Sequence, residues 1–548
     1  MKFIEIVLSP FWPDSKFINQ RTVNMGYSKL VRGNHLLTIN QLILKILSTD
    51  QIRINSEKNL NVIYNVKFLD LQLLNIQQNK KLLCFKGFLT AISVSTARQI
   101  PLSYPLSKKW FEDFEKAGIA VNKKVCTLMW NLLNLYKFLL TLYRSLKFLK
   151  GALRKNSIHD LTDNGNNVRR IYLPGLMRGQ FSVNTSEKGL NLVHWLKSTY
   201  SEDQQLHVLH SNSKFKKFKC IGENTTLNYI NLNWRWDGGI FDDLSGRLKI
   251  FGKLIFTIIV HKERRHLILY LNDTLLSVYL KRKFPIKEIL YICFDQSHIP
   301  NKPLWTFCSS EINTKCVLFF YAIAAEPSWP NGAIFQNTYW FGSQWLEYWA
   351  IDEIQTKSVK SVMFLGNSMV KEVGVPYWID TNSKFSAKQD SIALFDSEPQ
   401  RNLLLISNLV ALGIYTEHFY ESFFEEILRR GQYYKINVLH KGKRNTGKKL
   451  EEFYSDIINS NRSKYCEVYS IVDYGVSPHR LLRECIGSIS QPISTAAVIS
   501  KSLHLKTAFF DPTRSITKSD LELRGIDLLN SQIDLDHWFE ALKHRRGH

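Results

Sequence analysis

A hydroxyl-rich turn near the end of the chain is the first group of residues that could do chemistry. In GSISQPISTAAV, residues 487–498, the hydroxyl residues Ser490, Ser494 and Thr495 gather around Pro492, and a helix-like apolar run follows. Free backbone N–H groups at the start of a helix, together with nearby hydroxyls, can hold an anion such as phosphate. The alternative is that Ser494 only caps the helix.

Charged residues at the ends of two strand-like segments, SIALFDSEPQR (391–401) and YKINVLHKGKR (434–444), could join the same site. These residues are Asp396, Glu398, His440, Lys441, Lys443 and Arg444. The set is rich in cations, which suits a phosphate. For His440 the alternative is a strand-end histidine bonded to the backbone, and for the loop cations a solvated surface.

The elements that would position these residues alternate between strand and helix five times from about residue 358. We expect KSVKSVMFLG (357–366) to form a strand and NSMVKEVG (367–374) a short helix. Such alternation is typical of βαβ units and predicts a parallel, doubly wound sheet of the α/β class. Ligands bind such sheets beyond the carboxyl ends of the strands. The chain has neither a G-x-G-x-x-G fingerprint nor a P-loop, so the usual dinucleotide and P-loop sites are not expected.

Composition and charge limit the class of protein. A chain of 548 residues is too long for one ordinary core, so two or three domains are expected. Its net charge of +24 favours an anionic partner: nucleic acid, a membrane surface or a phosphorylated substrate. The eight cysteines include no C-x-x-C pair, which argues against a zinc site and suits a reducing compartment. We expect a cytoplasmic protein with neither a signal peptide nor a membrane-spanning helix.

One segment, near residues 124–155, suggests contact with a membrane surface. Leucines recur there at helical spacing, from Leu128 and Leu132 onward, and the basic residues share another face. The basic residues are Lys137, Arg144, Lys147 and Arg154. An amphipathic basic helix of this kind is typical of an interfacial anchor on anionic lipid. The alternative is a core helix whose basic face is solvated.

The C-terminal region resembles a GT-B glycosyltransferase of bacterial surface-carbohydrate (O-antigen or capsule) biosynthesis. INVLHKGKR is similar to the strand that carries the His-Pro motif of bacterial sialyltransferases and Kdo transferases. SQPISTAAV is similar to their Ser/Thr motif, one βα unit later. The resemblance covers residues 391–511, and it departs from the pattern where Lys441 follows His440 in place of proline.

The resemblance implies two Rossmann-like domains that face a cleft, with a C-terminal helix crossing back to the first domain. It divides the chain into an N-terminal acceptor-side domain (1–375) with the basic helical insertion, a linker (376–390), a donor domain (391–515) and a helical tail (516–548). The aromatic segment YWFGSQWLEYW (339–349) could line the cleft or belong to the core.

The resemblance also implies roles for the candidate residues, with neither metal nor cofactor. His440, with Lys441, would contact the leaving phosphate. Glu398, Lys443, Ser490, Ser494 and Thr495 would complete the donor site. The base would be an aspartate of the first domain: Asp237, which follows Trp234 and Trp236, is preferred over Asp163. A plain turn aspartate is the alternative for Asp237.

The function expected is transfer of a sugar from a nucleotide donor to a growing surface glycan at the inner face of the cytoplasmic membrane. The resemblance favours a CMP-activated acidic sugar such as Kdo or a nonulosonic acid. Two other classes remain open: a CDP-polyol phosphotransferase of the teichoic-acid type, and a basic nucleic-acid-binding protein. No RNP, zinc-finger or helix-turn-helix signature supports the last of these.

Overall fold

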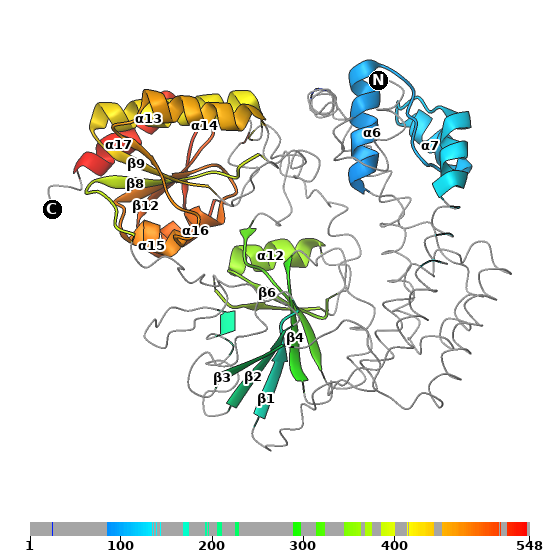
Figure 1. The fold of residues 1–548 in the computed structure, drawn as a ribbon, viewed down its shortest axis with the longest axis horizontal. Coiled ribbons are helices and arrows are strands. Elements are labelled where there is room, and N and C mark those ends of the chain that lie inside the picture. The colour runs from blue at the N-terminus through cyan, green and yellow to red at the C-terminus, as the bar shows by residue number, and fades with distance from the viewer. Residues whose placement is uncertain are drawn as a thin grey trace.

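The structure is a computed structural model of the 548-residue chain. It describes residues 85–133, 168–174, 205–210, 225–229, 289–296, 314–323, 345–362, 368–374, 385–399, 416–442, 452–514 and 523–544, with Met25, Leu135, Leu139, Tyr143, Leu192, Val193, Leu196, Ile414 and Ile516. Figure 1 shows these elements in colour along the chain. No helix among these residues is both long enough and apolar enough to cross a membrane.

The first sheet has seven parallel strands in the order β3-β2-β1-β4-β5-β6-β7. The strands are β1 Val168–Tyr172, β2 Gln205–His210, β3 Thr225–Tyr229, β4 Ile289–Asp295, β5 Lys315–Phe319, β6 Glu347–Ala350 and β7 Met369–Glu372. The central strands are buried nearly throughout, which explains apolar runs such as ILYICFD in β4. The sequence pattern of this region did not predict the sheet.

A helical region precedes this sheet in the chain. It contains α6 Phe85–Arg98, the 3-10 turn η2 Lys108–Trp110 and α7 Phe111–Lys116, and residues 123–133 are also helical. Cys126 and Met129 on the last of these helices are buried. The Cys126 thiol donates to Leu102 O at 3.2 Å, which joins this helix to the segment between α6 and η2.

The second sheet has six parallel strands in the order β10-β9-β8-β11-β12-β13. Its strands are β8 Ser391–Phe395, β9 Asn437–Lys441, β10 Tyr469–Ile471, β11 Gly487–Ser490, β12 Lys506–Phe510 and β13 Asp527–Leu529. Numbered within each sheet, both sheets begin 3-2-1-4-5-6, which is the classic Rossmann order. The prediction of an α/β protein with two GT-B-like Rossmann domains is therefore confirmed by strand order.

Helices cover both faces of the second sheet (Figure 1). Three lie on one face, α13 Glu417–Tyr434, α14 Glu452–Lys464 and α17 Gln532–His544; α15 Pro478–Arg483 and α16 Thr495–Ser502 lie on the other. Helix α13 begins where Thr416 Oγ1 accepts from Phe419 N at 3.3 Å. It ends at Lys435, whose φ of 55° is left-handed.

Three sequence expectations about individual elements are wrong. The segment KSVKSV belongs to helix α12 Glu353–Val362, and the predicted short helix contains strand β7. The C-terminal helix does not cross back to the first domain, because α17 packs on α13. Arg430 of α13 explains that placement: its Nε donates to Asp536 Oδ1 at 2.8 Å and its Nη2 to Gln532 O at 3.1 Å.

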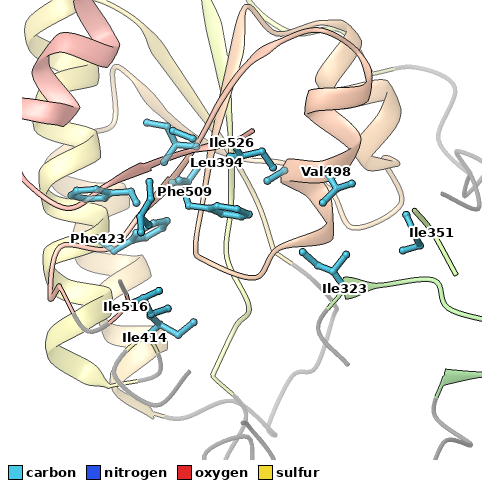
Figure 2. Close-up of a cluster of buried hydrophobic side chains, with 14 of the residues drawn as sticks. Ile323, Ile351, Leu394, Ile414, Phe423, Val498, Phe509, Ile516 and Ile526 are labelled. Carbon is cyan, nitrogen blue, oxygen red and sulfur yellow. The ribbon is translucent and has the colours of Figure 1, made fainter. Parts of the chain in front are cut away.

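Contacts between the two sheets come from loops near α16. Ile323 and Ile351, which follow β5 and β6, lie beside Val498 of α16 in one shared core cluster (Figure 2). Arg524, before β13, donates to both carboxylate oxygens of Asp352, at 2.6 and 3.2 Å. The C-terminal part of the chain therefore contacts the first domain through the side chain of Arg524, in the loop before β13.

The described part of the aromatic segment belongs to the core. Trp345, Tyr348 and Trp349 are fully buried, and the indole N–H of Trp349 donates to Glu347 Oε1 at 2.8 Å. Of the two alternatives for this segment, the structure supports core packing for these residues.

Candidate functional site

The strand order of the second sheet places a binding position between β8 and β11. The order reverses there, and open α/β sheets bind their ligands outside the carboxyl ends of the strands at such a point. Asp396 to Glu398 follow β8, and Gln491 to Thr495 follow β11. Most of the polar residues predicted as a site are thus brought to one edge of one sheet.

Gln491 ties the two strand ends together. It is fully buried, and its backbone N–H donates to Phe395 O at 2.9 Å. Its side-chain oxygen accepts from Ser397 N at 2.7 Å, while its amide nitrogen donates to Ile414 O at 2.6 Å. One side chain therefore fixes the exit of β8 and the approach to α13.

The turn after β11 is conformationally strained. Ile493 has a φ of 65°, a left-handed conformation that a β-branched residue rarely adopts. Such strain persists only where surrounding packing enforces it, and it concentrates at functional sites. Ile493 packs against the core cluster shared by the two domains, which supplies the enforcement.

Ser494 follows the strained residue at the N-cap of α16. Its backbone is extended, as an N-cap should be, but its side chain makes no capping hydrogen bond. The first-turn N–H groups of α16 and the half-buried Ser494 hydroxyl therefore have the composition of an anion site. The structural alternative, that Ser494 serves as a side-chain cap, is not what the structure shows.

Thr495 contacts the first domain. Its Oγ1 accepts a hydrogen bond from Ile323 N at 3.0 Å. Ser490, at the end of β11, is fully buried, and its hydroxyl has no hydrogen-bond partner in the described part of the chain. Of the three predicted hydroxyls, one therefore joins the domains, one is buried unpaired and one remains half-buried at the helix start.

Glu398 and Lys441 meet around Tyr474. Glu398 is buried with a φ of 26°, and its Oε1 accepts from the Tyr474 hydroxyl at 3.1 Å. Lys441 Nζ donates to Tyr474 O at 3.3 Å and lies 5.9 Å from the centre of the Tyr474 ring. Burial, and then the Glu398 carboxylate, raise the pKa of Tyr474 to about 12, so its hydroxyl stays protonated and donates.

Gly442 allows this arrangement because it has no side chain. A Cβ at this position would lie 2.1 Å from Glu398 Oε1 and 3.2 Å from Tyr474 Cε1. The glycine after Lys441 is therefore needed for the close approach of the Glu398 carboxylate.

His440 is enclosed in a buried polar network. Its Nδ1 lies 2.7 Å from the Tyr469 hydroxyl, its Nε2 lies 3.3 Å from Asp396 Oδ1, and its ring meets Phe424 edge-on. The Tyr454 hydroxyl donates to Asp396 Oδ2 at 2.5 Å. Burial, with Asp396 next, raises the pKa values of Tyr454 and Tyr469, which keeps both hydroxyls protonated.

The phosphate contact that the sequence suggested for His440 stays a prediction, and the structure adds the buried surroundings of its side chain. Its Nδ1 pairs with the Tyr469 hydroxyl. Its Nε2 lies near Asp396 Oδ1, but neither atom has a hydrogen-bond partner in the described part of the chain. The side chain is almost fully buried. Such an imidazole is suited to holding the ends of β8, β9 and β10 in register.

Other predicted residues lie outside the described residues. They are Asp237, Asp163, Lys443 and Arg444, with the basic side chains Lys137, Arg144, Lys147 and Arg154. Their roles stay predictions. Within the described ranges, no cluster of three or more His, Cys, Asp or Glu side chains is arranged to hold a metal ion.

Sequence reasoning missed the residues that organise the site. From the sequence, Gln491 looked like part of a turn. The tyrosines Tyr454 and Tyr469 of the His440 network, and Tyr474 beside Glu398, looked like parts of core elements. The one available signal was a glutamine between a strand and a proline, because a polar side chain there must find buried partners.

A comparison with protein families indicates the function of the carboxyl edge of the second sheet. One family model matches residues 254–539, just over half of the chain, and its description is "Polysaccharide biosynthesis PFTS motif protein". The chain belongs to this family. The PFTS-motif match runs from before β4 into α17, so it includes the switch point and the turn before α16. No curated protein matches the chain.

Several solved structures are similar to this chain at low sequence identity. UDP-GlcNAc 2-epimerase from Methanocaldococcus jannaschii is 10% identical over 68% of this chain and 92% of its own, with a TM-score of 0.37. A UDP-forming trehalose-phosphate synthase from Burkholderia vietnamiensis is 8% identical over 69% and 90%, with a TM-score of 0.36. UGT2 of Phytolacca americana is 8% identical over 69% and 90%, at 0.35.

Proposed function

We propose that the protein is a GT-B-type glycosyltransferase that binds a nucleotide-sugar donor at the carboxyl ends of β8 and β11. The observation that carries the proposal is the turn before α16, where a strained Ile493 presents Ser494 and a helix N-terminus at the topological switch point. Membership of a polysaccharide-biosynthesis family supports sugar transfer as the reaction class.

The family's description adds support for this turn. It names a PFTS motif, and Pro492-Ile493-Ser494-Thr495 has the same residue types in the same order: proline, a large apolar residue and two hydroxyl residues. We infer that this segment is the chain's form of the motif. The hydroxyl positions of the motif would then be those of Ser494 and Thr495.

The chemistry needed is stabilisation of the leaving phosphate. Negative charge grows on that phosphate as the glycosidic bond to the donor breaks, and preorganised donors aimed at it lower the barrier. The start of α16 supplies N–H groups, a favourable dipole and the Ser494 hydroxyl. In this proposal Lys441 and Lys443 add positive charge, and Asp237 takes the proton of the acceptor hydroxyl. The proposed transfer uses no metal ion.

The domain roles follow from the same proposal. Residues 1–375 would hold the acceptor glycan, and the domain from residue 391 the donor. Because β13 and α17 belong to the second sheet and its helical cover, we propose that the tail from residue 516 is part of the donor domain. We also propose that the protein works at the inner face of the cytoplasmic membrane, where lipid-linked glycans are extended.

The donor we favour is a CMP-activated acidic sugar, on the similarity of the β9 and β11 segments to sialyltransferase and Kdo-transferase motifs. A thermal-shift panel of CMP, CDP, UDP, GDP and TDP tests this, because a ligand that binds only the folded state raises the melting temperature. Stabilisation by CMP alone supports the donor, and stabilisation by CDP alone points to a CDP-polyol phosphotransferase. A panel without any stabilisation contradicts a nucleotide site.

A further inference from the structure

The helix that begins at Lys123 has an exposed apolar face. Leu128, Leu132, Leu135, Leu139 and Tyr143 are all helical, and their side chains are between 52 and 61% exposed. Their spacing of four, three, four and four residues puts them on one side of the helix. We call these five residues the exposed apolar face.

This face is distinct from the one that packs on the protein. Cys126 and Met129, on the other side of the same helix, are buried, and Cys126 is bonded to Leu102. The helix is therefore held to the domain through one side and leaves a second apolar side to solvent. Among the described residues, five of the twelve exposed large apolar side chains lie on this one face. Such clustering marks an interaction surface.

Charge indicates the kind of partner. Between Lys123 and Lys155 the sequence has eight lysines and arginines and not one acidic residue. Lys124, in the described part, is exposed beside the start of the face. Leucines and a tyrosine suit the boundary between headgroups and acyl chains, and a local excess of cations suits anionic headgroups.

We infer that the exposed apolar face inserts into the surface of an anionic membrane and holds the enzyme against it. The helix would lie in the plane of the surface, because the described residues provide an apolar side and not an apolar span. The inference stands on this helix alone and does not depend on which nucleotide the second domain takes.

Vesicle sedimentation of the full-length protein tests the inference. The wild-type protein should bind vesicles containing phosphatidylglycerol more tightly than phosphatidylcholine vesicles, and added salt should weaken that binding. The variant Leu132→Gln/Leu135→Gln/Leu139→Gln should lower the partition coefficient about 100-fold. This is about fivefold for each leucine that is half-buried in the lipid when the protein is bound. Glutamine is a good helix former, and the three leucines are exposed, so the melting temperature should not fall.

A matched control removes an exposed apolar side chain elsewhere. Ile533→Gln, on α17, replaces a residue that is 66% exposed and should leave vesicle binding unchanged. Unchanged binding by the triple variant overturns the inference. So does a wild-type protein that ignores vesicles but self-associates through this face, or one that binds RNA in preference to anionic vesicles. Nucleotide stabilisation measured on the same variants separates this outcome from a failure of the proposed transferase function.

Discussion

Replacing Gly442 by alanine should damage the Glu398 site in a predictable way. The added methyl carbon would lie 2.1 Å from Glu398 Oε1, over 1 Å closer than ordinary contact, so the carboxylate must move. Glu398 is buried and bonded to the Tyr474 hydroxyl, so this movement breaks a charge-assisted hydrogen bond. We expect a loss of about 2–4 kcal/mol in the free energy of unfolding, from overpacking together with the broken bond.

The assay is denaturant unfolding of a double-mutant cycle. Glu398→Ala removes the atoms that the new methyl group meets, so Gly442→Ala should cost less than about 1 kcal/mol in that background. The coupling energy between the two sites should then be at least about 1 kcal/mol. An equal cost of Gly442→Ala in both backgrounds would refute the role given to this glycine.

Three further changes follow from the second domain. His440→Ala should lower the free energy of unfolding by about 2–4 kcal/mol, since it leaves a cavity and removes the hydrogen-bond partner of the Tyr469 hydroxyl; a loss below about 1 kcal/mol in denaturant titration would contradict the network. Burial, and then Arg483, lower the pKa of His479 to about 4. The unfolded chain therefore binds a proton that the folded protein does not, and stability should fall by up to about 3 kcal/mol from pH 6.5 to pH 4. His479→Gln should flatten that part of the stability profile, and an unaltered slope would show that another group sets it. Lys435→Gly should raise the free energy of unfolding by about 0.5–1 kcal/mol, because Lys435 is exposed and its φ of 55° is left-handed, a conformation that glycine adopts without strain. A lower melting temperature in thermal unfolding would contradict this prediction.

The second domain could be predicted from the sequence because its strands are short apolar runs between clear helix patterns. β8 and β9 were predicted as strands, whereas β11 was wrongly taken as part of the turn before α16. The polar residues after these strands meet at one edge as expected. The resemblance implied a first Rossmann-like domain, but the sequence pattern did not locate its strands, because long connections separate them and parallel pairing joins segments distant in sequence. The segment 357–366 ends in the apolar run MFL before a glycine, which resembles the end of a buried strand. Its first six residues instead belong to helix α12, which begins at Glu353.

The site itself was only partly predictable. Hydroxyls near a proline mark a turn, but the left-handed backbone of Ile493 and the bond from Ile323 to Thr495 depend on the contact between domains. His440 looked like a ligand because it ends a strand, and only the fold brings Tyr469 and Asp396 to its two nitrogens. Local patterns predict which residues are polar at a strand end, whereas their partners come from elements far along the chain.

The central claim is that the turn before α16 holds the phosphate of a nucleotide donor, and titration calorimetry with CMP tests it most directly. Ser494→Ala should weaken binding by roughly 1–3 kcal/mol, the contribution of a charge-assisted hydrogen bond, without lowering the melting temperature, since Ser494 makes no capping bond. Ser502→Ala, at the other end of the same helix, is the matched control and should bind CMP like the wild-type protein. Equal CMP affinity in all three proteins, or weaker binding by the Ser502 variant alone, would contradict the account.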